Sequence, residues 1–209
     1  MSTSLSAAMR LGSRAEHEQA EEAPFVTDLL AGRVGEQGYA EYLLRLRAVY
    51  DALEGAVRAH ADDPAVAAVH DPDLERVPAL DADLDHWLPD GPRTVASPAV
   101  TAYRERLEHA RAWGPLLAAH HYTRYLGDLS GGQAIGRVVD RTFGLAGRGV
   151  AFYDFPAIPR PKPYKDAYRA RLDALGLSPV QTARVVDEVR AAFRLNHGLF
   201  AELVDSLPA

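Results

Sequence analysis

The sequence contains no cysteine, and only two of its 23 basic residues are lysine. The absence of cysteine excludes disulfides, thiol nucleophiles, zinc–thiolate centres and cysteine-held iron–sulfur clusters, so any bound metal would need His, Asp or Glu. No apolar run reaches the length of a membrane-spanning helix, and the first residues, MSTSLSAAMRLGSRAEH, lack the apolar core of a signal peptide. We therefore expect a cytoplasmic protein that does not associate with membranes.

The size and the charge of the chain further limit the class of protein to which it can belong. Its 209 residues, of which 47% are hydrophobic and 25% charged, suit one globular domain that spans residues 1–209. The formal net charge of -6 argues against nucleic acid as a partner, because nucleic-acid-binding proteins need a basic surface.

Signals for helices are frequent, whereas signals for strands are nearly absent. Two Ser-Pro pairs, at 97–98 and 178–179, have the pattern of a capping serine followed by a first-turn proline. Apolar residues recur at helical spacing elsewhere. The predicted helices cover residues 5–21, 24–32, 36–60, 78–87, 98–113, 115–143 and 179–203, and a loop rich in proline and aromatic residues covers 144–163. The sequence thus predicts an all-α fold with one core.

The first predicted helix carries a candidate metal ligand. His17 and Glu21 are four residues apart and share a helix face, so the carboxylate can accept the outer N–H of the imidazole, as is usual for a metal-bound histidine. Arg10 lies two turns earlier on this face and could meet an anionic ligand edge. The simpler interpretation is an exposed helix with an incidental ion pair.

A second candidate is the segment HHYTRYLGDLSGGQ, where glycines interrupt an apolar helical pattern. Gly127 and Gly131 are four apart, so their bare backbone would lie on one face and let a flat group approach the main chain. Asp128, between them, would need a hydrogen bond or water inside an apolar helix. The alternative is a simple turn between two helices.

The third candidate is the stretch near residue 165, which contains both lysines of the chain with tyrosines between the charged residues. Lys165 and Arg169 share a helix face with no obvious acid four residues away, which suits paired carboxylates on a ligand. A solvated basic face is the alternative.

Taken together, these segments resemble the haem oxygenase family. The resemblance runs almost from end to end, through LSAAMRLGSRAEHEQAE, AVYDALE, YTRYLGDLSGGQ, FYDFP, YKDAYRAR and AAFRLNHGLF. It implies a single all-α domain in which haem lies between a proximal and a distal helix. It also implies oxidative cleavage of haem at a meso carbon, the α position being expected, to biliverdin, carbon monoxide and ferrous iron.

The resemblance also implies roles for individual residues. It makes His17 the axial iron ligand, Glu21 its hydrogen-bond partner, and Gly127 and Gly131 the distal wall. It places Asp128 in a distal water network. The remaining expected site residues are Tyr50 and Arg124 in that network, Arg10, Tyr122, Lys165 and Arg169 around the propionates, and Phe193 and Asn196 in the distal pocket. Arg10 stands where the animal enzymes usually have lysine, and their membrane tail is not found, so the chain is similar to the soluble bacterial form.

The implied ligands are haem b, which is both cofactor and substrate, and O2 as co-substrate. An electron-donor reductase or ferredoxin system of unknown identity is also implied. Two alternatives remain at this point: a haem carrier or sensor that does not degrade haem, and a non-haem di-iron oxidase on a similar scaffold. A carrier would not need Asp128 between bare glycines, and a di-iron site would need several carboxylate and histidine ligands from different helices.

Overall fold

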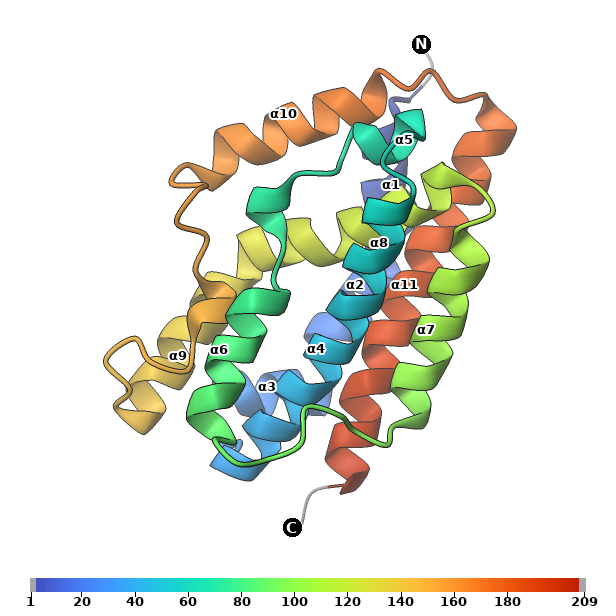
Figure 1. Cartoon of the computed structure of the whole chain (residues 1–209). Coiled ribbons are helices and arrows are strands. Elements are labelled where there is room, and N and C mark those ends of the chain that lie inside the picture. The colour runs from blue at the N-terminus through green and yellow to red at the C-terminus, as the bar shows by residue number, and fades with distance from the viewer. Residues whose placement is uncertain (1–2, 207–209) are drawn as a thin grey trace.

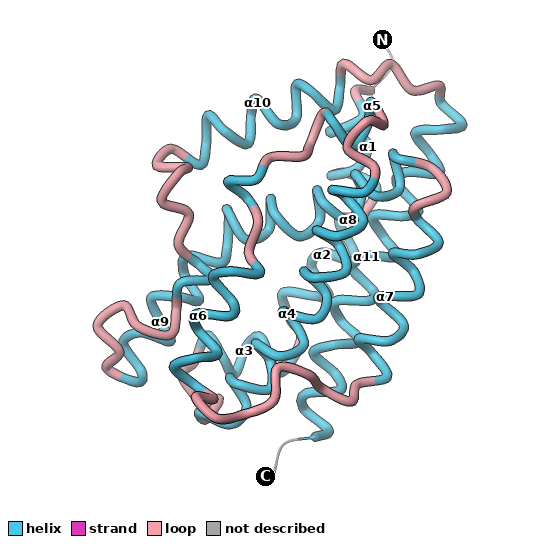
Figure 2. The backbone as a smooth tube through the Cα atoms, viewed as in Figure 1, coloured by secondary structure: helices cyan, strands magenta, loops and turns pink. Residues whose placement is uncertain are grey.

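The computed structural model describes residues 3–206, and these form helices joined by loops without any strand (Figures 1 and 2). The α-helices are α1 (Leu5–Gly12), α2 (Arg14–Glu21), α3 (Pro24–Leu30), α4 (Glu36–Ala59), α5 (Pro64–Ala67), α6 (Val77–Trp87), α7 (Pro98–Ala110), α8 (Gly114–Gly127), α9 (Gln133–Phe143), α10 (Pro161–Asp173) and α11 (Pro179–Ser206). A π-helix (Asp128–Gly132) joins α8 to α9, and 3₁₀ turns cover Pro72–Leu74 and Ala151–Tyr153. The predicted all-α class is confirmed. Within residues 3–206, no helix combines the length and apolar character needed to cross a membrane.

The predicted helix over residues 5–21 is wrong in one respect, because it breaks between α1 and α2. Ser13 leaves the helical conformation, with φ -111° and ψ 15°, and its hydroxyl donates to the carbonyl of Met9 at 2.8 Å. A serine side chain that bonds to the backbone in this way competes with helical continuation. The break divides the segment into two short helices that can point in different directions.

Two other predicted boundaries also change. The predicted helix over 115–143 runs through the π turn instead of staying α-helical, so the alternative of a simple turn at Ser130–Gly132 is wrong. The predicted loop over 144–163 ends at Arg160, because Pro161 occupies the first turn of α10, where its missing N–H costs nothing. The short helix α5, capped by Asp63, was not predicted.

The core lies between three long helices and α8. Helices α4, α7 and α11 run side by side, and α8 crosses between them and packs against each (Figure 1). Fully buried tyrosines, which include Tyr39, Tyr50, Tyr103 and Tyr125, fill much of this core together with leucines and valines. Helix α11 also contacts α1, α2 and α3, so it reaches both sides of the bundle.

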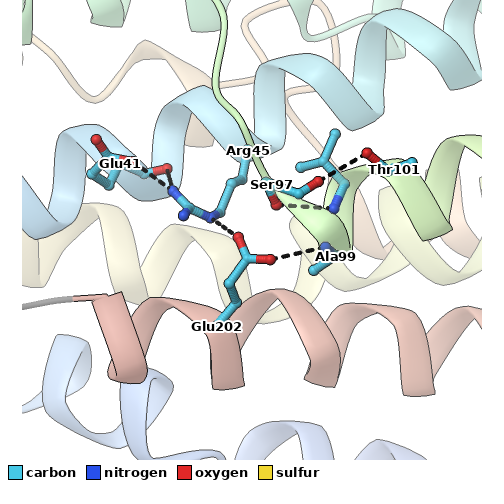
Figure 3. Close-up of polar contacts among 7 residues, drawn as sticks. Glu41, Arg45, Ser97, Ala99, Thr101 and Glu202 are labelled. Carbon is cyan, nitrogen blue, oxygen red and sulfur yellow. Dashed lines mark hydrogen bonds and ion pairs between the residues drawn. The ribbon is translucent and has the colours of Figure 1, made fainter.

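A buried arginine joins α4, α7 and α11 at one end of the bundle (Figure 3). Arg45 Nε donates to Glu202 at 2.9 Å, and its Nη1 donates to Glu41 at 2.6 Å. The second oxygen of Glu202 accepts the backbone N–H of Ala99 at 2.8 Å, in the first turn of α7. Because each charge is paired, this buried group costs little of the folding free energy and fixes the ends of three helices.

A second buried carboxylate joins α7, α8 and α11. Glu188 receives hydrogen bonds from Arg106 of α7 and lies 2.8 Å from His120 Nε2 of α8. Burial raises the pKa of Glu188, but the hydrogen bonds from His120 and Arg106 outweigh it and lower the pKa from 4.5 to about 2. The ionised form therefore stabilises the fold.

This gives a stability prediction with a defined pH window. Because the folded pKa lies below the unfolded one, the stabilisation is present above pH 4.5 and is lost as the pH falls toward 2. We expect Glu188→Gln to lower the free energy of unfolding by about 3 kcal/mol at pH 7 and by much less at pH 2.5 in urea titrations. Glu108→Gln, which removes an exposed pair with Arg111, is the matched control and should change stability by less than about 1 kcal/mol. An equal loss at both pH values in Glu188→Gln would contradict the role of the ionised carboxylate.

Candidate functional site

A cavity of about 830 Å³ opens between α2 on one side and α8 with the π-helix on the other. Helices α1, α3 and α11 contribute further wall residues, and a large part of the lining is apolar, with Phe25, Leu29, Ile135 and Phe193 among it. Its volume suits a ligand much larger than a metabolite of a few atoms.

The structure brings nearly all of the predicted site residues to this cavity. Those that line it are Arg10, His17, Glu21, Tyr122, Arg124, Gly127, Asp128, Gly131, Arg169, Phe193 and Asn196. Tyr50 and Lys165 do not line it but bond to groups in its wall. Residues far apart in the sequence are therefore gathered around one cavity.

His17 stands on α2 with half of its side chain exposed to the cavity. Its Nδ1 lies 3.4 Å from a carboxylate oxygen of Glu21, and its ring meets Phe193 edge-on at 5.3 Å between centroids. Glu21 on Nδ1 leaves Nε2 as the nitrogen available to a metal, and a carboxylate in this position makes that nitrogen a stronger ligand.

The opposite wall is bare backbone. A Cβ atom added to Gly127 or to Gly131 would meet no other described atom within 4 Å, although both residues lie in helical backbone. Packing within the protein therefore does not explain why these positions lack side chains. By contrast, a Cβ on Gly136 would lie 2.8 Å from that of Tyr153, so this glycine is needed for packing. The helical glycines Gly55 and Gly198 also face open space, but Gly127 and Gly131 line the cavity, so the space in front of them is room for a ligand.

The π-helix widens the wall between Gly127 and Gly132. Its hydrogen-bonding pattern places an additional residue in one turn, a feature often found at functional sites. The hydroxyl of Ser130 donates to the carbonyl of Leu126 at 2.6 Å and so supports the widened turn.

A network of buried polar side chains lies behind this wall. The hydroxyl of Tyr50 donates to Asp128 Oδ2, and Arg124 Nε donates to the oxygen of Tyr50 at 3.2 Å. Arg124 Nη1 also donates to Asn196 of α11 at 2.8 Å. The network holds one carboxylate and one guanidinium in a buried position, with hydrogen bonds to both, as burial of charges requires.

Asp128 holds a proton more readily than an ordinary aspartate. Burial raises its pKa, and this outweighs the charge of Arg124 and the hydrogen bond from Tyr50, which lower it. Only this carboxyl group, among the lining residues of α8 and the π-helix, lies next to the two open glycines. It could exchange protons with water in the cavity.

The cations at the rim surround a tyrosine. Burial raises the pKa of Tyr122. The charges of Arg169 and Arg10 oppose part of this rise, so both guanidinium groups act on this hydroxyl. Arg169 also pairs with Asp166 at 3.2 Å, three residues earlier, a spacing that the sequence analysis did not consider. Two cations and a hydroxyl at one rim suit an anionic ligand edge.

Lys165 makes a contact that the sequence did not indicate. Its Nζ donates to Ser130 Oγ at 2.7 Å and approaches the carbonyl of Leu129 at 3.4 Å. Burial, and then the charge of Arg169, lower its pKa. Lys165 thus ties α10 to the π-helix in this structure.

Several lining residues were missed because their pattern is that of ordinary core. Phe25, Tyr42 and Phe200 form an aromatic group at one end of the cavity, with centroid distances of 5.2 to 6.2 Å. Their helical spacing looks the same whether a residue faces a core or a pocket. Nothing in the sequence marked Ser130 as a lining residue except its place beside the glycines.

The side chains do not offer a site for two metal ions. Within residues 3–206, no three or more His, Cys, Asp or Glu side chains are arranged to hold a metal ion. The di-iron alternative, which needs several such ligands, therefore has no structural support. The cavity instead offers apolar walls, one histidine ring and the guanidinium groups of Arg10 and Arg169.

Comparisons with known proteins point to one family. A family model described as "Heme oxygenase" matches residues 3–202. "Heme oxygenase 1" of Homo sapiens is 38% identical over 99% of this chain and 74% of its own length, and "Heme oxygenase 1" of Nostoc sp. is 37% identical over 99% and 89%.

Solved structures are similar in fold as well. Heme oxygenase-2 from Synechocystis sp., in complex with heme and NO, has a TM-score of 0.92 at 34% identity and covers 97% of this chain and 86% of its own. The heme oxygenase from Leptospira interrogans has a TM-score of 0.91 at 33% identity, with coverages of 96% and 100%.

The two kinds of glycine predict opposite effects on the ligand-free protein. Gly131→Ala should raise the free energy of unfolding by at most about 1 kcal/mol, and with it the melting temperature, because alanine favours helix and its Cβ meets open space. Gly136→Ala should lower the free energy of unfolding by about 1–3 kcal/mol, because its Cβ would press on Tyr153. Calorimetry without ligand measures both; equal destabilisation would mean that Gly131 is required for packing and not for a ligand.

Proposed function

Because this chain belongs to the haem oxygenase family, we propose that its cavity holds haem b as both cofactor and substrate, between α2 and the π-helix. The family reaction is the oxidative cleavage of haem to biliverdin, carbon monoxide and iron, and this chain is such a haem-degrading enzyme. The observation that carries the proposed site is that Gly127 and Gly131 open onto the same cavity as His17.

On the α2 side, His17 would hold the haem iron through Nε2. Glu21, 3.4 Å from Nδ1, would accept the proton of that nitrogen and so fix the orientation of the ring. Phe193 limits the rotation of the ring from the side. A bound iron would supply the site for activation of O2, the co-substrate.

At the rim, Arg10, Arg169 and Tyr122 receive the haem propionates. Guanidinium groups bind carboxylates through paired hydrogen bonds, so they fix the rotation of the macrocycle in its plane. Lys165 is close enough to Ser130 and Arg169 to join this group. The in-plane rotation decides which meso carbon faces the open glycines, and we propose the α position.

On the distal side, the chain supplies a proton without placing an acid–base side chain against the reacting atoms. Gly127 and Gly131 present only backbone there. Burial raises the pKa of Asp128, and Tyr50, itself held by Arg124 and through it by Asn196, keeps the carboxyl group in place. A water molecule held by Asp128 would carry a proton into the cavity beside the glycines and would keep the carboxyl group itself out of that space. This feature separates the proposal from a haem carrier, which has no need of a buried acid.

We also propose a domain organisation, an electron source and a location for the protein. Residues 1–209 form one domain, which is supported by a buried core whose members run from Leu5 to Leu203. The electrons come from a reductase or ferredoxin system, as the reaction requires. A cytoplasmic location fits a chain without cysteine.

The ligand assignment is tested with His17→Ala. Wild-type protein mixed with haem and ascorbate under air should lose its Soret band while the broad red band of biliverdin grows. His17→Ala should bind haem weakly through the apolar cavity and the rim cations, without turnover, and added imidazole should restore part of the activity. Wild-type spectra and activity in His17→Ala would show that His17 is not the iron ligand.

The proton role is tested with Asp128→Ala and Asp128→Asn. Asp128→Ala should bind haem with an almost unchanged Soret band, but biliverdin formation should fall by about 100-fold, the usual size of a general-acid contribution. With hydrogen peroxide, it should oxidise guaiacol faster than the wild type. Asp128→Asn keeps a hydrogen-bonding group for Tyr50, so a milder loss would show that the hydrogen bond matters more than the charge. Biliverdin formation at the wild-type rate in Asp128→Ala would be inconsistent with the water-mediated proton path.

A further inference from the structure

The break between α1 and α2 rests directly on α11. A Cβ on Gly12 would collide with Cγ1 of Val186, so only glycine lets the chain approach α11 this closely at the end of α1. Ser13 is buried at the same point, and its main chain turns out of the helix. The contact therefore fixes the place where the direction of the chain changes.

An arginine of α11 caps this break. Arg190 Nε donates to the carbonyl oxygen of Gly12, the last residue of α1, at 2.6 Å. A helix end leaves such carbonyls without helical partners, and a guanidinium satisfies one with a charge-assisted hydrogen bond. Arg190 Nη1 is itself held by Asp187 at 2.9 Å, one turn earlier on α11.

The same face of α11 also contacts the residue before His17. Glu16 Oε1 lies 3.8 Å from Arg190 and 3.6 Å from Arg194, and Phe193 meets the ring of His17. With 19% of its side chain exposed, Glu16 is the least exposed acid of α2 for which a contact is described, whereas Glu18 and Glu21 are half-exposed or more. Two cations around one carboxylate resist rotation of α2 about its axis.

We propose that Arg190 is a positioning residue for His17: with the Gly12–Val186 contact, it sets the rotation of α2 and so the direction of the iron ligand. This inference rests on the proposed role of His17. Helix α2 has only eight residues, too few to be stable alone, so its orientation must come from its contacts. A slip of one residue would turn His17 by about 100° away from the cavity.

The test uses two independent changes to the full chain. Arg190→Met removes the donors and the charge but keeps the apolar stem, and Arg190→Lys restores one donor. Gly12→Ala presses on Val186, and Gly12→Ala combined with Val186→Ala gives the space back. Arg184→Met is the matched control, because Arg184 lies on the same helix but stacks over Trp113.

Two readouts report on position. In the haem-free protein, hydrogen exchange of amides 14–21 should be about tenfold faster in Arg190→Met and Gly12→Ala, with α10 unchanged. With haem, the dissociation constant should rise about tenfold, equal to about 1.4 kcal/mol, and the iron–histidine stretching frequency in the resonance Raman spectrum should shift and broaden. Arg190→Lys and the double variant should recover toward the wild type.

The failure of this inference can be told apart from the failure of the ligand assignment. If His17→Ala loses the nitrogen ligand but Arg190→Met matches Arg184→Met in exchange and in Raman frequency, the positioning role is wrong and His17 stands. If His17→Ala keeps a nitrogen ligand, the proposed ligand is wrong, and the positioning role toward it is wrong as well. Loss of recovery in the double variant would equally overturn the part assigned to Gly12 and Val186.

Discussion

The constraint on which the structure depends is that an apolar cavity of about 830 Å³ must stay open between two helices. Apolar walls tend to close, since contact between them removes surface from water. Helix α11 opposes this closure, because it packs against α8 on one side and against α1, α2 and α3 on the other. Asn196 holds Arg124 behind the distal wall, and Arg190 holds the end of α1. One long helix thus sets the separation of both walls.

The distal wall shows how a buried acid can lie at a cavity while its carboxyl group is held from behind. Asp128 follows Gly127 directly, yet its carboxyl group bonds to Tyr50 behind the wall, while the glycines leave the front bare. The polar network is linked to the core through Tyr50, whose ring packs edge-on against Tyr125 and Phe152 at 5.5 Å. These ring contacts hold Tyr50, and through its hydrogen bond Asp128, in place beside the cavity.

Helix positions and the main site residues followed from the sequence because their signals are local. Capping serines and prolines marked α7 and α11, and the resemblance over six segments led to the prediction of His17, Asp128 and Arg169 as site residues. Long-range contacts left no such signal. Arg190 has the pattern of an exposed helix residue, and nothing local links it to Gly12, which is 178 positions away. The break at Ser13 was hidden because α1 and α2 continue one helical pattern, and the partner of Lys165 depends on how α10 folds back.

The π-helix has a consequence for how the chain can change length. A turn with one additional residue is equivalent to a single insertion in an α-helix. Deletion of one residue between Asp128 and Gly132 would restore α-helical winding and leave α9 nearly in phase with α8, because the additional residue is taken up within the widened turn. Val139 would stay in the core, but the widened turn that carries Asp128 and Gly131 into the wall of the cavity would be lost. The wall of the cavity therefore depends on the number of residues in this turn as well as on their side chains.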